Sequence, residues 1–213
     1  MFYPINLKLE KKTCLVVGGG KTAERKILRL LAAGADVTVV APEISDEIKK
    51  LGETEQLRIE QREAQVKDVA GKLLVICATP DEKLNRDICA AAKAENALVN
   101  MAAPPLELSD FDLPAAADFG DLLVTYSTSS KCPELSRQLR QRYFGELDCY
   151  GRWLEILAPY RAGLKKRLGS SKACTEFWRR ALNAEVMDLV AEGKLEDAEE
   201  RIVNALGCLR SES

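Results

Sequence analysis

The first half of the chain alternates short apolar runs with segments of helical periodicity. Runs that are apolar and rich in β-branched residues, or that alternate apolar with polar positions, predict strands at 13–17, 36–41, 57–61, 73–78 and 97–101. Apolar residues spaced along one helical face predict helices over 22–33, 44–51 and 81–94. Strands that alternate with helices predict an α/β fold with a doubly wound parallel sheet.

The pattern changes beyond residue 113. A strand is predicted at 122–127, and Pro133 suits the first position of a helix that runs to residue 143. After residue 150 only helical patterns remain, at 153–168, 172–182, 184–192 and 195–206. The sequence therefore predicts three parts: an α/β domain at 1–113, a small mixed segment at 114–149 and a helical C-terminal domain at 150–213.

Composition narrows the class of protein. The chain has 213 residues, of which 46% are hydrophobic, and this is enough for a large core. Its 31 basic and 33 acidic residues predict neither nucleic acid nor an anionic membrane as a partner. No apolar run approaches a membrane span, and the N-terminus shows no signal-peptide pattern. Seven scattered cysteines without a C-x-x-C pair fit a reducing compartment, so a cytoplasmic location is expected.

The chain contains no histidine. This removes the commonest general base and the commonest metal ligand. Acid–base chemistry must fall to other titratable side chains, or a cofactor must supply the reaction.

A glycine-rich turn follows the first strand, and its sequence fits the pattern G-x-G-x-x-A. The first glycine allows a tight turn, the second lets the backbone approach a pyrophosphate, and the alanine lets the helix pack closely on the sheet. The helix N-terminus adds amide donors and a positive dipole end. The predicted cofactor-binding residues of this Rossmann-type domain are Gly18, Gly19, Gly20, Lys21, Thr22 and Ala23. The alternative, a glycine turn that binds nothing, stays open at this point.

The end of the second strand indicates which dinucleotide is bound. The acidic residue that usually holds the adenosine ribose is replaced there by Ala41, Pro42 and Glu43. Either Glu43 takes that role or the backbone holds the ribose. No arginine follows to favour the 2′-phosphate of NADP, so NAD is the predicted cofactor.

Several stretches together resemble the precorrin-2 dehydrogenase family, which includes the N-terminal modules of sirohaem synthases. The resemblance lies in residues 16–26, 33–42, 78–81, Asn85, Val99-Asn100, Pro114, 127–133 and Phe177-Trp178, and it covers nearly the whole chain. It implies NAD-dependent oxidation of precorrin-2 to sirohydrochlorin on the path to sirohaem, with Thr79 among the cofactor-binding residues. It also implies a homodimer built by the middle segment, and some members of the family insert ferrous iron.

The sequence departs from the family pattern after the last predicted strand of the first domain. Family members carry an aspartate where Ala103 stands, and that aspartate is their candidate for catalysis and metal handling. Asp110 and Asp112 lie a few residues further on and are the predicted catalytic replacements. Two solvated loop carboxylates are the alternative. No metal site is predicted.

A second departure concerns the loop before Pro133. Two glycines of the family are replaced by Ser129 and Ser130, whose Cβ atoms restrict a positive φ. The loop still precedes a helix N-terminus, which suits substrate carboxylates. The predicted substrate-binding residues are Ser127, Thr128, Ser129, Ser130 and Lys131. An ordinary solvated helix cap is the alternative.

These departures affect the two implied reactions differently. Hydride transfer depends mainly on positioning the cofactor and the substrate, whereas metal insertion needs a base for the pyrrole protons and a path for Fe²⁺. We therefore predict dehydrogenation and doubt chelation. The competing hypothesis is a non-catalytic NAD- or tetrapyrrole-binding protein of the same fold. Basic clusters at 165–167 and 179–180 are either solvated helix faces or contacts for substrate carboxylates.

Overall fold

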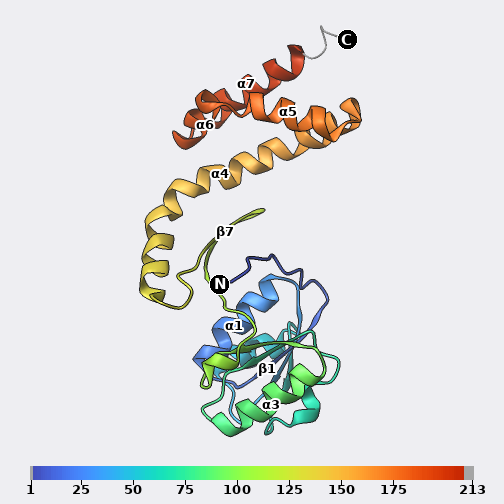
Figure 1. Cartoon of the computed structure of the whole chain (residues 1–213), viewed down its shortest axis with the longest axis vertical. Coiled ribbons are helices and arrows are strands. Elements are labelled where there is room, and N and C mark those ends of the chain that lie inside the picture. The colour runs from blue at the N-terminus through green and yellow to red at the C-terminus, as the bar shows by residue number, and fades with distance from the viewer. Residues whose placement is uncertain (1, 209–213) are drawn as a thin grey trace. The chain divides into compact units, whose positions relative to one another are not determined.

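The computed structural model describes residues 2–208, and its chain forms two compact units, Met1–Leu113 and Pro114–Ser213. Figure 1 shows an α/β unit that contains the N-terminal half, and a second unit dominated by helices. Each unit is described by itself below. Within the described residues, no helix is both long enough and apolar enough to cross a membrane.

The first unit is built on a five-stranded sheet in the order β3-β2-β1-β4-β5. Its strands are β1 (Thr13–Val17), β2 (Asp36–Val40), β3 (Arg58–Glu60), β4 (Leu74–Cys77) and β5 (Leu98–Met101). All four pairings are parallel, and the last residues of β1, β2 and β4 lie level with one another. The predicted parallel sheet is confirmed, and its carboxyl ends share one edge.

Helices cover both faces of this sheet. On one face, α1 (Lys21–Ala32) and α2 (Asp46–Glu53) bury Ile27 and Ile48 against inward-facing residues of β1 and β2. On the other face, α3 (Glu82–Ala94) and the short 3-10 helix η1 (Val66–Val69) bury Ile88 against β1 and β4. Because both faces are covered, the central strands β1 and β4 are almost entirely apolar, whereas the edge strand β3 carries exposed Arg58 and Glu60.

Capping side chains determine where the helices of the first unit begin. The Asp81 carboxylate accepts a hydrogen bond from Leu84 N at 3.0 Å and starts α3. The Ser45 hydroxyl accepts from Ile48 N at 3.4 Å, so α2 begins at Asp46 rather than at the expected residue 44. A further 3-10 helix, η2 (Leu106–Leu108), follows β5.

The second unit opens with an antiparallel hairpin. Strands β6 (Ala115–Phe119) and β7 (Leu122–Tyr126) pair with Ala117 opposite Val124, and Gly120 turns the chain at φ +72°. The sequence predicted β7 but not β6. Three alanines in a row carry little strand propensity, and β6 is a strand because of its pairing and its packing on a helix.

One long helix replaces two predicted ones. Helix α4 (Pro133–Leu168) has 36 residues and runs without a break through the interval between the expected helices at 133–143 and 153–168. Gly151, within that interval, is needed for packing, because a Cβ there would lie 2.5 Å from the Phe119 Cβ. The expected boundary between 149 and 150 falls inside this helix.

Three further helices complete the second unit. They are α5 (Ser171–Ala181), α6 (Ala184–Ala191) and α7 (Leu195–Cys208). Gly169 ends α4 with φ +59°, and the chain then folds back so that Trp153 and Leu164 of α4 share a core with Trp178 and Ile202. The predicted helical character of this part is confirmed.

Candidate functional site

The glycine turn lies at the carboxyl edge of the sheet, between β1 and its two neighbours. Gly18 has φ +122°, and a Cβ on it would lie 2.6 Å from the Ala78 carbonyl oxygen beyond β4. A Cβ on Gly19 would lie 2.1 Å from the Glu43 carbonyl oxygen beyond β2. The two glycines therefore let β1 turn in a gap that no side chain could share.

Gly20 has different surroundings. It is exposed, and a Cβ on it would have no protein atom within 4 Å. It is the N-cap of α1 but offers no side-chain hydrogen bond, and the first intrahelical bond runs from Glu24 N to the Gly20 carbonyl at 3.0 Å. Open space therefore lies before uncapped amides and the positive end of a helix dipole, an arrangement that suits a phosphate group. Ala23 is fully buried against the sheet, as the motif requires.

The residues after β2 lie beside this turn. Gly18 N donates to the Val40 carbonyl at 3.0 Å, and Ser45 N donates to the Gly19 carbonyl at 2.9 Å. Ala41 is buried, whereas Pro42 and Glu43 are exposed. The structure thus brings the two predicted groups of cofactor-binding residues together at one edge, with the Glu43 carboxylate at the surface.

Thr79 belongs to a buried polar network at the end of β4. Its hydroxyl donates to Asn85 Oδ1 at 2.8 Å, and Asn85 Nδ2 donates to the carbonyls of Thr79 and Pro104, each at 2.9 Å. Asn85 is fully buried, so these bonds tie α3 to the segments after β4 and β5. The motif pointed to Asn85, but its role as this link depends on contacts between distant segments.

The two predicted catalytic aspartates lie in different surroundings. Both carboxylate oxygens of Asp110 are engaged: one accepts from Val99 N at 2.9 Å and the other pairs with Lys93 Nζ at 2.9 Å. The hydrogen bond to Asp110 raises the pKa of Lys93. Asp110 therefore secures the chain along the outer edge of β5.

Asp112 lies beside α1. Burial, followed by the charges of Arg29 and Arg25, lowers the pKa of Lys26, and the Asp112 carboxylate acts in the opposite direction. Between the two aspartates the chain passes from one face of the sheet to the other, because Leu108 packs on the α3 side and Phe111 on the α1 side. Asp110 and Asp112 are close in the sequence, but in the structure their carboxylates have different neighbours.

The predicted substrate loop joins β7 to α4. Ser129 and Ser130 both have a positive φ, 52° and 60°, where a glycine would be relaxed. The Thr128 hydroxyl accepts from Cys132 N and from Ser136 Oγ, each at 3.2 Å. The loop therefore keeps the backbone that glycines would give, and Thr128 serves as its cap on α4.

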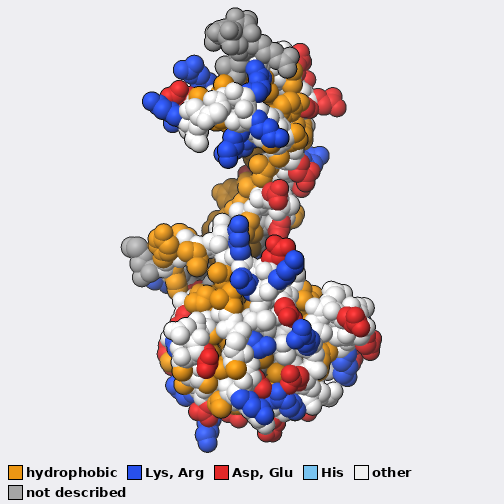
Figure 2. Space-filling model, turned by 90° about the vertical axis from the view of Figure 1, so that its right-hand side faces the viewer, with side chains coloured by type: hydrophobic (Ala, Val, Ile, Leu, Met, Phe, Trp, Pro, Cys, Tyr) orange, Lys and Arg blue, Asp and Glu red, His pale blue; other side chains and the backbone are white. Residues whose placement is uncertain are grey.

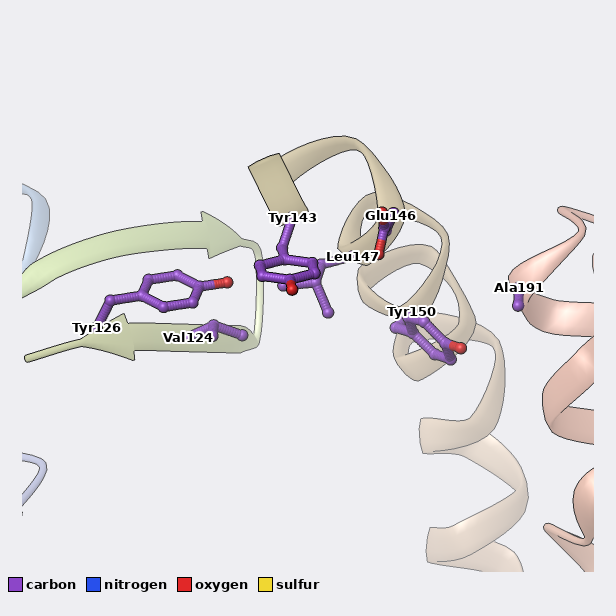
Figure 3. Close-up of a pocket in the computed structure, with 7 residues that line it drawn as sticks. All are labelled: Val124, Tyr126, Tyr143, Glu146, Leu147, Tyr150 and Ala191. Carbon is purple, nitrogen blue, oxygen red and sulfur yellow. The ribbon is translucent and has the colours of Figure 1, made fainter. Parts of the chain in front are cut away.

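A hollow of about 500 Å³ lies in the second unit next to this loop. Figure 3 shows Val124 and Tyr126 of β7 facing residues of α4 across it. Its lining residues are Val124, Tyr126, Tyr143, Glu146, Leu147, Tyr150 and Ala191. The sequence did not predict this group, although the alternation in β7 and the spacing of 143, 147 and 150 along a helix indicate it.

Among the residues that the structure describes, no group of three or more His, Cys, Asp or Glu side chains could hold a metal ion. What the site does offer is a glycine turn, an uncapped helix N-terminus and an acidic neighbour at the carboxyl edge of a parallel sheet. These features define the class of dinucleotide-binding α/β proteins.

Comparison with known proteins gives the family. Residues 5–115 match the family described as "Putative NAD(P)-binding", and residues 149–206 match the sirohaem synthase dimerisation region. The chain belongs to the family of sirohaem synthases and precorrin-2 dehydrogenases, as its sequence motifs predicted. Its first unit is an NAD(P)-binding domain.

Individual relatives agree with this assignment. The chain is 35% identical over 205 residues to the sirohaem synthase of Methylococcus capsulatus, and 36% identical over 199 residues to that of Psychromonas ingrahamii. The matches cover 96% and 92% of this chain but 43% and 42% of those proteins, so the chain spans less than half their length. A solved structure, "SirC, precorrin-2 dehydrogenase", superposes with a TM-score of 0.75 at 26% identity, over 95% of this chain and 100% of the other.

The strained loop yields a stability prediction. Ser129→Gly should raise the free energy of unfolding by about 0.5–1 kcal/mol, because relief of the left-handed backbone outweighs the extra entropy of an unfolded glycine. Chemical denaturation measures the effect. Ser127→Gly is the control: its φ is not positive, and it loses the hydroxyl that accepts from Ser129 N, so it should destabilise. Equal effects of the two substitutions would refute the strain.

Proposed function

We propose that this chain is a precorrin-2 dehydrogenase, which oxidises precorrin-2 to sirohydrochlorin with NAD as the hydride acceptor. The observation that carries the proposal is the open space before Gly20 and the uncapped start of α1, at the carboxyl edge of the sheet. The likeness to a solved precorrin-2 dehydrogenase over that protein's whole length supports it. In the reaction a hydride passes from a substrate carbon to the nicotinamide, and a proton leaves the substrate.

The residues of the first unit fit a bound dinucleotide. The amides of Gly20, Lys21 and Thr22 would receive the pyrophosphate, while Gly18 and Gly19 keep the turn compact. The exposed Glu43 carboxylate would accept hydrogen bonds from the adenosine ribose hydroxyls and repel a 2′-phosphate. This charge favours NAD over NADP. Bound NAD supplies an acceptor for the hydride, so the protein's own task is placement.

For the proton, we retain Asp112 of the two predicted aspartates. Both oxygens of Asp110 already hold β5 and Lys93, so its contacts support a structural role in place of the predicted catalytic one. Asp112 is half-buried near Lys26, and its carboxylate would accept the proton that leaves the substrate.

For the substrate, we propose the loop of residues 127–131 and the adjoining tyrosine hollow. The flat faces of Tyr126, Tyr143 and Tyr150 offer stacking surfaces to a pyrrole ring system. The amides in the first turn of α4, which receive no hydrogen bond from the N-cap side chain, would bind its carboxylate arms together with Lys131. Glu146 is the acidic side chain of the hollow and would accept hydrogen bonds from pyrrole N–H groups.

An anaerobic turnover assay tests the proposal directly. Purified protein with precorrin-2 and NAD should form sirohydrochlorin and NADH in equal amounts. The competing candidate, a non-catalytic NAD- or tetrapyrrole-binding protein, predicts binding of either ligand without turnover. Binding with no NADH formed would therefore decide for that candidate.

Two glycine substitutions separate cofactor binding from folding. Gly20→Val places a side chain in open space, so it should leave the unfolding temperature unchanged and weaken NAD binding at least about tenfold. Gly19→Ala meets the Glu43 carbonyl, so it should lower the unfolding temperature as well. Calorimetric titration with NAD and thermal unfolding measure the two effects. Unaltered NAD affinity in Gly20→Val would rule out this binding site.

The alanine at position 103 predicts slow chelation. Without the carboxylate of the family, insertion of Fe²⁺ into sirohydrochlorin lacks a base, which is typically worth about 10²–10⁴-fold in rate. We expect Ala103→Asp to raise the rate of iron insertion toward this range and to leave dehydrogenation nearly unchanged. Ala103→Asn, of the same shape but uncharged, is the control. If the native chain inserts Fe²⁺ as fast as it forms sirohydrochlorin, the prediction is wrong.

We also propose that the chain forms a homodimer in the cytoplasm. The family's dimerisation region matches residues 149–206, whereas the sequence analysis assigned this role to 114–149. Exposed apolar side chains favour an interface that includes the earlier segment, since Leu123, Leu135 and Phe144 are each about half exposed there. Leu123 alternates with the residues of β7 that line the hollow, so it lies on the opposite face of the hairpin.

The buried thiols of Cys14, Cys77 and Cys89, which form no disulfides, fit a reducing cytoplasm.

Charge substitutions on that face test the dimer. Leu123→Glu and Leu135→Glu should each shift the protein from dimer to monomer in sedimentation at micromolar concentration, because a buried unpaired carboxylate opposes association. Leu28→Glu on α1 is a matched control, since Leu28, Leu123 and Leu135 are all 49% exposed. A native chain that sediments as a monomer would contradict the proposal.

A further inference from the structure

A group of basic side chains lies at the end of α4 and along α5, far along the chain from the substrate loop. Its members, here called the basic surface, are Arg161, Lys165, Lys166, Arg167, Lys172, Arg179 and Arg180. All seven are exposed, and between 161 and 180 the sequence holds a single acidic residue, Glu176. Figure 2 shows several Lys and Arg side chains on the helices of the second unit, with Asp and Glu side chains among them.

These cations differ from several other cations of the same unit, which have acidic partners. Arg152, Lys194 and Arg201 pair with carboxylates at 3.4, 2.7 and 3.0 Å. Within the described part of the chain, no ion pair reaches any member of the basic surface. Helix dipoles explain the cations in the last turns of α4 and α5 but not Lys172, which stands in the first turn of α5, where a positive charge is disfavoured.

The surroundings limit what could bind there. Between residues 155 and 202 no large hydrophobic side chain is exposed, which removes an anchor for a membrane or an apolar protein interface. Phe177 and Trp178 pack edge to face in the helical core, so no exposed ring is available to stack nucleic-acid bases. The neighbouring helices α6 and α7 are acidic and would repel a long polyanion. A compact anion with several charges fits these conditions.

The basic surface is separate from the substrate loop. The loop precedes Pro133 at the start of α4, whereas Lys165 and Arg167 lie in its last turn. A helix rises about 1.5 Å per residue, so roughly 48 Å of helix separates the two ends. One tetrapyrrole could not contact both within a chain.

We propose that the basic surface is a second anion-binding site, which captures tetrapyrroles with many carboxylate arms outside the reaction site. The identity of the ligand rests on the proposed function; the presence of an anion site does not. Unpaired cations at a surface raise the local concentration of an oppositely charged ligand and speed its association, and salt screens the effect. The site would hold substrate or product near the enzyme in dilute solution.

Uroporphyrin, which carries carboxylates on all its side chains, is the probe for this site. We expect the affinity of the chain for uroporphyrin at low salt to fall about tenfold in the triple variant Lys165→Gln, Lys166→Gln, Arg167→Gln. The matched triple variant Arg152→Gln, Lys194→Gln, Arg201→Gln removes as many charges from paired positions and should change binding less than about twofold. Fluorescence anisotropy gives the affinities, and the difference should disappear at high salt.

Three further measurements make the result decisive. Lys131→Gln should leave the affinity of the basic surface for uroporphyrin unchanged, because the loop lies at the other end of α4. Deuteroporphyrin, with fewer carboxylates on a similar ring, should bind the basic surface more weakly. Equal affinities of the two triple variants for uroporphyrin would overturn the proposal. Duplex DNA or anionic vesicles that bind more tightly than uroporphyrin would also overturn it, if the substitutions at 165–167 alone abolish that binding. Failure of precorrin-2 oxidation, by contrast, would leave these binding results unchanged.

Discussion

The contact on which the first unit depends is that of two glycines with two carbonyl groups. Gly18 lies against the Ala78 carbonyl and Gly19 against the Glu43 carbonyl, so that β1 turns between the segments that leave β2 and β4. A single Cβ at either position would displace a neighbouring strand end. Because the turn is this compact, α1 starts directly behind it, and its first amides face open space beside Gly20. The open space before α1 is thus a consequence of backbone packing.

The neighbouring edge of the sheet is held by polar contacts instead. The fully buried Asn85 side chain spans Thr79 and Pro104, and the Asp110 carboxylate joins Val99 to Lys93. Each of these side chains forms hydrogen bonds with backbone groups that would otherwise be unpaired at the ends and edge of β4 and β5. Rigid placement of these segments matters for the proposed dehydrogenation, since the chain has no histidine and positioning supplies much of the rate of hydride transfer.

Much of the first unit could be predicted from the sequence, because its features depend on residues close together along the chain. The glycine turn and Ala23 act through their own backbone and size, so their motif was sufficient to predict the tight turn after β1 and the close packing of α1 on the sheet. Parallel strands and their helices followed from periodicity. The structure differs from the predicted elements where contacts between segments far apart in the sequence determine the secondary structure. The sequence predicted two helices where α4 is continuous and its Gly151 packs against Phe119, and the alanines of β6 form a strand only through pairing with β7. The partners of Asp110 on α3 and β5 also could not be seen in the sequence, and its predicted catalytic role stays a prediction.

Hydrogen–deuterium exchange of the backbone amides of residues 20–24, followed with and without NAD, tests whether the amides at the start of α1 bind the pyrophosphate of NAD. We expect slower exchange in this segment on addition of NAD, in the native chain and not in Gly20→Val, while the first turn of α3, capped by Asp81, stays unchanged in both. Protection that spares residues 20–24, or that persists in Gly20→Val, would contradict this mode of binding.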